Sequence, residues 1–226
     1  MDILYIVIPA YNESENVSSV IDAWYDIISG HDGGGLSRLV IVNDGSTDDT
    51  REMVLEMKKS RPLLTLLTRV NGGHGAAVMT GYRYALANGA DYIFQTDADG
   101  QTDPSYFEEF WRDRERYDAI FGMRPKRGDG RFRAFTEKVL CLLLRITLGA
   151  RLPDANAPFR LMSSGFMKEH LPLVPRGCLI PNAILTAMAS VDGSRYAFRG
   201  IPFMPRTHGK TSVGVKRIVS IGLRSL

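Results

Sequence analysis

The chain has 226 residues, of which 44% are hydrophobic and 23% are charged, and its formal net charge is +3. These values describe a globular protein with a core large enough for one domain. The small positive excess does not indicate a nucleic-acid-binding protein, although it suits an anionic ligand or a membrane face. The two cysteines, Cys141 and Cys178, have neither disulfide nor metal-site spacing, which favours a reduced, cytosolic setting.

No targeting or membrane-spanning segment is expected. The chain opens with the strand-like residues 3–8 and not with a signal sequence. Its most apolar later stretch, residues 139–144, stops at Arg145 and is too short to cross a bilayer.

The first half alternates apolar strands with helical patterns. Continuous apolar runs predict strands buried in a parallel sheet, at residues 3–8, 39–42, 63–67, 91–96 and 118–122. Helices are expected between these runs, with a cap at Ser14 for the first, a capping box of Ser46 and Asp49 for the second, and Asp103 with Pro104 opening the fourth. This alternation predicts an α/β fold with a doubly wound, mostly parallel sheet and helices on both faces.

The second half is less regular. Residues 124–133 are predicted to form a loop rich in glycine and arginine, followed by an apolar helix over 135–148 and a proline-containing loop over 154–160. Further along, a helix over 184–191, a strand over 196–201 and a helix from Val213 are expected.

Polar residues follow three of the predicted strands: residues 9–13, 43–45 and 97–99. Any one of these segments alone is as well explained as a turn with a helix cap. In an open α/β sheet, however, the carboxyl ends of the strands share one edge, where ligands bind. Three such segments on one edge therefore favour a ligand site.

Asp97 and Asp99 are two carboxylates separated by one small residue, and Gln101 offers a third oxygen two positions later. In an extended segment both carboxylates would point the same way. Oxygen ligands of this kind suit Mg²⁺ or Mn²⁺, which bind through one or two carboxylates and bridge substrate phosphates. We therefore predict a metal site for Mg²⁺ or Mn²⁺ at Asp97, Asp99 and Gln101.

The segment 71–77, Asn-Gly-Gly-His-Gly-Ala-Ala, could present backbone N–H groups and a helix N-terminus to a phosphate. It matches neither the P-loop nor the dinucleotide-binding fingerprint. A tight turn with small residues packing helix on strand explains it equally well, and His74 is not assigned as an acid or a base.

Four segments in order resemble the family 2 glycosyltransferases of the GT-A fold. They are Ile8-Pro9-Ala10-Tyr11-Asn12-Glu13, residues 42–48 (Val-Asn-Asp-Gly-Ser-Thr-Asp), residues 71–77 and residues 95–101 (Gln-Thr-Asp-Ala-Asp-Gly-Gln). The resemblance covers essentially the whole chain. It implies one GT-A domain over 1–226, with a nucleotide-sugar-binding half over 1–123 and an acceptor-binding half over 124–226.

The resemblance also implies roles for individual residues. Pro9, Tyr11, Glu13 and Asp44 would hold the donor nucleoside, Asp97 would lie near the ribose or the metal, and Asp99 and Gln101 would bind the metal at the diphosphate. Ala10, Asn71 and Ala98, from the same segments, complete the expected donor site.

The second half is most similar to the dolichyl- or polyprenyl-phosphate sugar synthase branch of the family. Residues 154–160 match that branch's Asp…Gly-Phe-Arg segment, except that Pro158 replaces the glycine. Residues 206–212 match an Arg-x-x-Gly-x-Ser loop with the serine, Ser212, displaced by one position. The resemblance implies acceptor roles for Arg160 and Ser212.

The two acceptor classes need different chemistry. A lipid phosphate is already a nucleophilic oxyanion and needs cations to hold it, which could be Arg124, Arg131, Arg133, Arg206 and Lys210. A sugar hydroxyl instead needs a base, for which Asp154 is the best candidate. The predicted catalytic residues are therefore Asp99, Asp154, Arg124 and Arg133.

The favoured hypothesis is an inverting enzyme that moves a sugar from a UDP- or GDP-sugar to a membrane polyprenyl phosphate. The alternatives are transfer to a saccharide hydroxyl in surface-polysaccharide assembly, a non-catalytic nucleotide-binding module and a nucleotidyltransferase, which would release pyrophosphate instead of a nucleoside diphosphate. The helix over 135–148, with Lys138 and Arg145 among its apolar residues, is either a core helix or a helix at the membrane surface. The expected partners are a nucleotide sugar and a polyprenyl-phosphate or glycan acceptor, with no nucleic acid, at the cytoplasmic face of the membrane.

Overall fold

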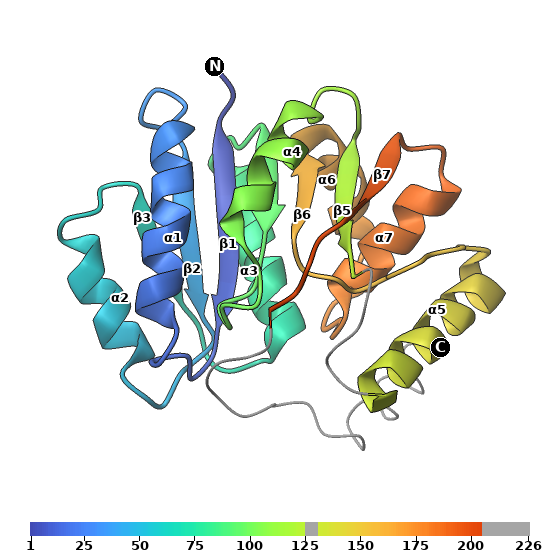
Figure 1. Ribbon diagram of the computed structural model, residues 1–226, viewed down its shortest axis with the longest axis horizontal. Helices are drawn as coiled ribbons and strands as arrows, with labels where there is room; N and C mark the ends of the chain where they lie inside the picture. The colour runs from blue at the N-terminus through green and yellow to red at the C-terminus, as the bar shows by residue number, and fades with distance from the viewer. Residues whose placement is uncertain (125–130, 205–226) are drawn as a thin grey trace.

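The computed structural model describes residues 1–124 and 131–204, without the side chains of residues 131–136. These residues contain a seven-stranded sheet in the order β3-β2-β1-β4-β6-β5-β7. The strands are β1 (Leu4–Ala10), β2 (Arg38–Asn43), β3 (Leu64–Thr68), β4 (Tyr92–Gln95), β5 (Ala119–Met123), β6 (Arg160–Ser163) and β7 (Tyr196–Gly200). Only β6 runs antiparallel to its neighbours (Figure 1). The mostly parallel sheet predicted from the sequence is confirmed.

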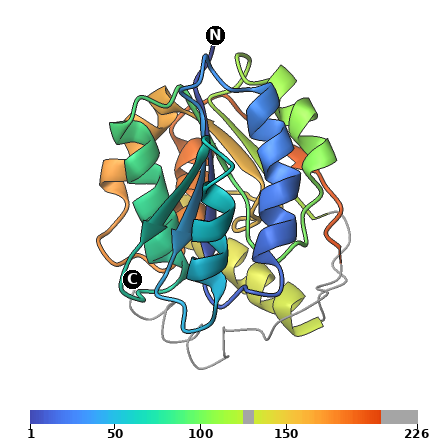
Figure 2. The same ribbon diagram turned by 90° about the vertical axis from the view of Figure 1, so that its left-hand side faces the viewer.

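Helices cover both faces of the sheet (Figure 2). One face carries α1 (Val17–Gly30), α2 (Thr50–Lys58) and α4 (Phe107–Arg112), and the other carries α3 (His74–Ala87), α6 (Ser164–His170) and α7 (Pro181–Val191). Short 3-10 turns, η1 (Pro104–Tyr106) and η2 (Leu171–Leu173), precede α4 and follow α6. The layers arise because β1 is buried along its whole length, with alternate side chains packed into the two cores.

The core on the α1 face is built largely of aromatic side chains. Trp24 of α1 lies 5.2 Å from Phe94 of β4, ring centroid to ring centroid, and Phe94 lies 4.8 Å from Phe159 at an almost perpendicular angle. On the opposite face α3 approaches β1 closely at Gly81, where a Cβ would lie 2.2 Å from Val7 Cγ1. A glycine is therefore required for α3 to pack at this depth.

The helix α5 (Arg131–Leu148) lies beside α7 at the lower edge in Figure 1, the edge at which the parallel strands end. Its buried Leu144 packs with Ala183 and Ala187 of α7. Among the residues that the structure describes, no helix is both long and apolar enough to cross a bilayer.

Two of the predicted helix caps are wrong. The first helix begins at Val17 after Asn16, and Ser14 lies outside it. The second begins at Thr50, and its first N–H is accepted by Asp48 Oδ1 at 3.1 Å and not by a box of Ser46 and Asp49. Both differences arise because the loops before these helices are used to bind each other. The predicted Asp103 cap is confirmed, with Oδ1 accepting from Ser105 N at 2.9 Å.

The second half contains two elements that the sequence pattern did not predict, β6 and α6. The apolar helix also begins earlier than expected, at Arg131 instead of residue 135, and so includes part of the predicted arginine-rich loop. The helix expected from Val213 lies outside the described residues.

Candidate active site

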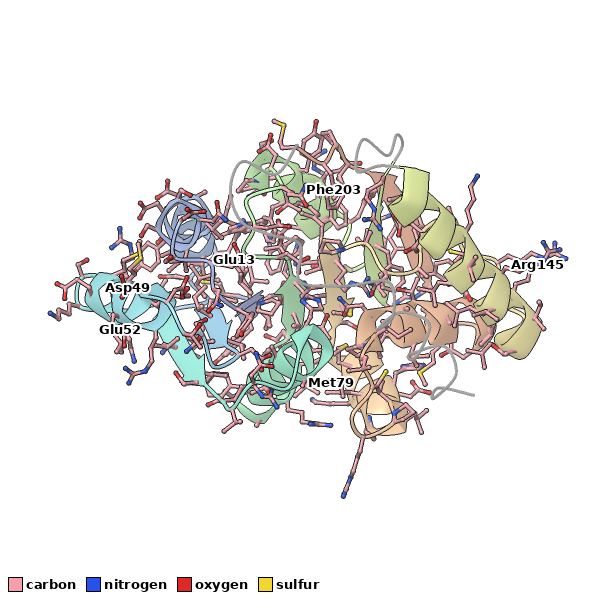
Figure 3. The ribbon with its side chains drawn as sticks, turned by 90° about the horizontal axis from the view of Figure 1, so that it is seen from below. Glu13, Asp49, Glu52, Met79, Arg145 and Phe203 are labelled. Atoms are coloured by element: carbon pink, nitrogen blue, oxygen red, sulfur yellow. The ribbon has the colours of Figure 1, made fainter. Side chains whose placement is uncertain are left out.

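The parallel strands bring the polar segments together at their common carboxyl edge, which faces the viewer in Figure 3. The loop after β1 and the loop after β2 bind each other directly. Thr47 N donates to Asn12 Oδ1 at 2.8 Å, and Asn12 N donates to Ser46 Oγ at 3.0 Å. Asn12 adopts a φ of 54°, a left-handed conformation that asparagine tolerates. These two predicted donor loops therefore form one surface.

Asp44 joins a third loop to this surface. Its buried carboxylate accepts from Gly73 N at 2.7 Å and Gly72 N at 3.1 Å, and it also pairs with the Arg69 guanidinium. The segment that includes Asn71 is therefore folded around the Asp44 carboxylate. At Gly45 a φ of 70° and a close approach to Asn71 N exclude a side chain.

The predicted donor residues differ in how far they are exposed at this edge. Tyr11 is 40% exposed and Asn71 is exposed, whereas Pro9 and Ala10 are buried within β1. Glu13 is half-buried, and its Oε2 accepts from Asn16 Nδ2 at 2.7 Å. The structure thus brings Tyr11, Glu13, Asp44 and Asn71 to one edge, with Pro9 and Ala10 as the buried support beneath them.

The segment 97–99 follows β4 as a turn and not as the extended segment that the sequence suggested. Asp97 Oδ1 accepts from Gln95 Nε2 at 3.0 Å and lies 3.9 Å from His74 Nε2. Asp99 Oδ1 accepts from Gln101 N at 3.1 Å. Ala98 between the two carboxylates is buried.

Gln101 is fixed by the segment that follows β7. Its Nε2 donates to Met204 O at 2.9 Å, and its backbone oxygen accepts from Met204 N at 2.8 Å. Thr102 also forms a bridge with Phe203. The expected metal site and the last described residues of the predicted acceptor half are therefore in direct contact.

The residues at this edge fit a divalent metal that is shared with a ligand. Among the described residues, no cluster of three or more His, Cys, Asp or Glu side chains could hold a metal by itself. Asp97 and Asp99 instead offer two half-buried carboxylates on one turn. This incomplete set suits a metal whose remaining positions are filled by diphosphate oxygens and water, as is usual for Mg²⁺.

On the predicted acceptor side, the buried Asp154 and the half-buried Arg124 form a bidentate ion pair. Arg124 Nε lies 2.8 Å from Asp154 Oδ2, and Nη2 lies 3.0 Å from Oδ1. Glu137 of α5 adds a second carboxylate 3.9 Å from Arg124 Nη2, and its Oε1 also accepts from Ala155 N at 2.7 Å. These contacts connect the loop after β5 to the loop before β6 and to α5.

Arg160 lies in the protein interior, although it was a predicted phosphate ligand. It is 1% exposed, and its guanidinium donates to the backbone oxygens of Ala157 at 2.6 Å and Asn182 at 2.9 Å. A buried guanidinium committed to protein carbonyls cannot reach a bound phosphate. We therefore treat Arg160 as a structural residue and leave it out of the acceptor site.

The side chains of the remaining predicted acceptor residues lie outside the described part of the structure. The side chains of Arg131 and Arg133 fall outside the described part of α5, although its backbone begins at Arg131. Arg206, Lys210 and Ser212 lie beyond residue 204, where the described chain stops.

Four residues of this edge were not predicted from the sequence: Arg69, Gln95, Glu137 and Asn182. Gln95 had a visible signal, because it is a polar residue in an apolar strand and stands two positions before Asp97. Glu137 is likewise an acid in an apolar helix. Arg69 and Asn182 had no such signal in the sequence. Arg69 pairs with Asp44 and Asn182 donates to Gln95, and both partners are distant in the chain.

Comparisons with known proteins identify the family of this chain. Residues 5–171 match the family model described as glycosyl transferase family 2. The chain belongs to this family, and the resemblance seen in its sequence is confirmed.

Curated relatives are transferases that act on lipid phosphates, according to their names. An undecaprenyl-phosphate 4-deoxy-4-formamido-L-arabinose transferase of Edwardsiella ictaluri is 26% identical over 96% of this chain and 64% of that protein. A dolichyl-phosphate beta-glucosyltransferase of Trichomonas vaginalis is 37% identical over 46% of this chain and 33% of its own length. The chain therefore spans less than two thirds of the length of these relatives.

Solved structures show the same fold. The glucosyl-3-phosphoglycerate synthase of Mycobacterium tuberculosis, in complex with Mn²⁺, UDP and phosphoglyceric acid, has a TM-score of 0.68 at 20% identity, covering 98% of this chain and 75% of that one. S. aureus TarS 1–349 in complex with UDP-GlcNAc has a TM-score of 0.64 at 15% identity, covering 95% and 62%. The GT-A fold expected from the sequence is confirmed.

Proposed function

We propose that this protein is an inverting, metal-dependent glycosyltransferase that moves a sugar from a UDP- or GDP-sugar to a polyprenyl phosphate. The family, the lipid-phosphate substrates in the names of relatives and the Mn²⁺–UDP complex of a structural neighbour support the class of reaction. The choice of acceptor rests on the chain's own residues.

The observation that carries the acceptor assignment is the ion pair between Asp154 and Arg124. Asp154 is 3% exposed, and both of its carboxylate oxygens lie within 3.0 Å of Arg124 nitrogens. Both oxygens of this carboxylate already accept hydrogen bonds from one guanidinium, so it is poorly placed to take a proton from a sugar hydroxyl. An acceptor that is already an oxyanion needs no such base. The pairing therefore favours a phosphate over a hydroxyl.

In this proposal the edge residues bind and orient the two substrates. Tyr11, Glu13, Asp44 and Asn71 surround the nucleoside, and Asp97, Asp99 and Gln101 hold the metal at the diphosphate. When bound, the metal would offset the negative charge that develops on the departing nucleoside diphosphate. Cations from Arg131, Arg133, Arg206 and Lys210 hold the acceptor phosphate for attack opposite the leaving group, which inverts the sugar's configuration.

Transfer to a saccharide hydroxyl is the second candidate. Pro158 and the displaced Ser212 depart from the lipid-phosphate branch in the acceptor half, which is the observation that favours it. A non-catalytic nucleotide-binding module is the third candidate. The presence of Asp97, Asp99 and Gln101 together argues against it.

The test is a product assay. The protein is incubated with Mn²⁺, a panel of UDP- and GDP-sugars and an equal mixture of a short polyprenyl phosphate and an oligosaccharide, and the products are identified by mass spectrometry and NMR. We expect one nucleotide sugar to give a polyprenyl-phosphate sugar of inverted configuration with release of the nucleoside diphosphate. Transfer only to the oligosaccharide would establish the second candidate, and nucleotide binding without transfer the third.

A lipid acceptor also requires contact with a membrane, for which α5 offers a surface. Its exposed apolar side chains include Ile146 at 72% and Leu142 at 54%, and Lys138 and Arg145 are exposed among them. Arg145 extends outward from α5 in Figure 3. An apolar helix face flanked by cations suits the surface of an anionic bilayer. We propose that this face lies on the membrane at the cytoplasmic side.

Vesicle binding tests the role of α5. Replacing Ile146 or Leu142 with Glu removes apolar burial worth about 1.5–3 kcal/mol per side chain, so we expect at least about tenfold weaker binding to vesicles containing phosphatidylglycerol. Val191→Glu is the control, because Val191 is 50% exposed at the end of α7 distant from this edge. Equal losses in all three variants would contradict the assignment.

A further inference from the structure

A series of hydrogen-bonded, buried polar residues runs through the protein interior behind Asp97. Tyr82 Oη donates to Asn182 Oδ1 at 2.8 Å, Asn182 Nδ2 donates to Gln95 Oε1 at 2.8 Å, and Gln95 Nε2 donates to Asp97 Oδ1 at 3.0 Å. Tyr82 and Gln95 are 0% exposed and Asn182 is 2% exposed. This hydrogen-bonded series therefore connects α3, α7 and β4 to one carboxylate at the carboxyl edge of the sheet.

The direction of these hydrogen bonds is set by Tyr82. Burial raises the pKa of its phenol, so that the hydroxyl stays protonated. A buried hydroxyl hydrogen without an acceptor costs free energy, which makes Tyr82 the donor to Asn182 Oδ1. Asn182 then presents its amide nitrogen to Gln95, and Gln95 presents its own amide nitrogen to Asp97. The group facing Asp97 is thus a donor, as a carboxylate requires.

Asn182 is itself held firmly at the start of α7. Its backbone oxygen accepts from Arg160 Nη1 at 2.9 Å and from Thr186 Oγ1 at 2.8 Å. The same Arg160 donates to Ala157 O in the loop that carries Asp154. The buried arginine therefore anchors the residue that orients Gln95, which gives it a role that differs from phosphate binding.

We propose that Asn182 and Gln95 are positioning residues that orient the Asp97 carboxylate for the metal–diphosphate group. They would set the affinity for the metal without contacting metal or nucleotide, because a hydrogen bond to Oδ1 restrains rotation of the carboxylate. The proposal rests on the proposed function, in which Asp97 lies at the metal. Groups that orient metal ligands in this way typically change metal affinity 10- to 100-fold when they are replaced.

The test compares Asn182→Asp with Asn88→Asp. Both replace one hydrogen-bonding amide with a carboxylate, but Asn88 lies at the far end of α3, where its Nδ2 donates to Tyr84 O at 2.8 Å. Titration calorimetry of UDP and of GDP at a series of Mn²⁺ concentrations gives the Mn²⁺ concentration at which nucleotide binding is half-maximal. We expect Asn182→Asp to raise this concentration at least about tenfold and Asn88→Asp to leave it within about twofold of wild type.

Two further variants separate positioning from a general structural effect. In an Asp97→Asn background, Asn182→Asp should cause no further loss of Mn²⁺ affinity, because it acts through the Asp97 carboxylate. If Asn182→Asp does not fold, Tyr82→Phe and its control Tyr84→Phe replace it, with an expected loss of about fivefold for Tyr82→Phe alone.

Each remaining outcome counts against the inference. A folded Asn182→Asp protein with wild-type Mn²⁺ dependence would overturn this inference but not the proposed function. An equally large further loss of Mn²⁺ affinity in the Asp97→Asn background would do the same. Equal Mn²⁺ affinity in Tyr82→Phe and Tyr84→Phe would do the same. A wild-type protein that binds neither UDP nor GDP with Mn²⁺ would overturn the proposed function together with the inference.

Discussion

At the scale of single residues, Asp44 shows how one side chain can organise a site. Its carboxylate receives two backbone N–H groups from the turn at Gly72 and Gly73 as well as the Arg69 guanidinium. Charge-assisted bonds of this kind fix backbone that would otherwise be free to move. The loop that the sequence suggested as a phosphate cradle is therefore held in shape by Asp44, the residue that directly follows the neighbouring strand β2.

Replacing Asp44 should affect both stability and nucleotide binding. We expect Asp44→Ala to lower the free energy of unfolding by about 1–3 kcal/mol, because donors of the turn lose their acceptor. It should also weaken UDP or GDP binding. Asp49→Ala is the matched control, since Asp49 is exposed and forms no side-chain cap. Urea unfolding and nucleotide titration measure the two effects, and similar losses in both variants would contradict this account.

The residues that the sequence could place at the site are those marked by a local pattern, a polar residue close behind an apolar run. Asp97, Asp99 and Asp44 stand directly after apolar runs, so their common edge follows from the parallel sheet. Arg160 shows the limit of that reasoning. The family resemblance implied a phosphate ligand, whereas burial against the carbonyls of Ala157 and Asn182 depends on contacts that no local pattern encodes.

At the scale of elements, the depth at which α3 packs on β1 depends on Gly81. A Cβ at this position would lie 2.2 Å from Val7 Cγ1, so Gly81→Ala must displace the Val7 side chain, the helix or the strand. We expect a loss of about 1–3 kcal/mol in the free energy of unfolding. Gly30→Ala is the control, because nothing lies within 4 Å of a Cβ there. A Gly81→Ala protein as stable as Gly30→Ala would show that the packing is looser than described.

The edge strand β7 is attached to α4 by charge as well as by the sheet. Arg199 Nη2 lies 2.6 Å from Asp113 Oδ2, and its hydrogen bond holds the pKa of the Asp113 carboxyl below the ordinary value of 3.8. Since the folded pKa is the lower one, this stabilisation is present above pH 3.8 and is lost as the pH falls through the folded value.

Acid unfolding tests this attachment. We expect the wild type to lose stability below about pH 4, and Asp113→Asn to be about 0.5 kcal/mol less stable at pH 7 with a shallower decline in acid. Urea midpoints at pH 7 and at pH 3 provide the comparison. The same decline of the urea midpoint in both proteins would mean that the pair of Asp113 and Arg199 contributes nothing to stability.

The long apolar runs predicted most of the sheet because parallel strands buried on both faces are continuous in sequence. β6 gave no such signal. It has four residues, begins with the charged Arg160 and pairs antiparallel between β4 and β5. The caps of the helices that begin at Val17 and Thr50 were misassigned because Ser14, Ser46 and Asp48 serve the contact between two loops, which appears only when both loops are folded.

At the scale of the whole molecule, the two halves meet around the turn at Asp97–Asp99. The donor half contributes the loops after β1, β2, β3 and β4. The acceptor half reaches the same place through Met204, which binds Gln101, and through Asn182, which binds Gln95. We therefore expect that a change in the predicted acceptor half can alter the predicted donor site without touching a ligand.

The central claim is that Asp97–Asp99 is a metal-dependent binding site for a nucleoside diphosphate. Titration calorimetry of UDP and GDP, with and without Mn²⁺, tests it most directly on the wild type, Asp99→Asn and Asp103→Asn. Asp103 is the control, because it lies four residues further on and caps η1. We predict Mn²⁺-dependent binding that Asp99→Asn weakens at least about tenfold and Asp103→Asn preserves. Binding that is independent of Mn²⁺, or equal in Asp99→Asn and the wild type, would contradict the account.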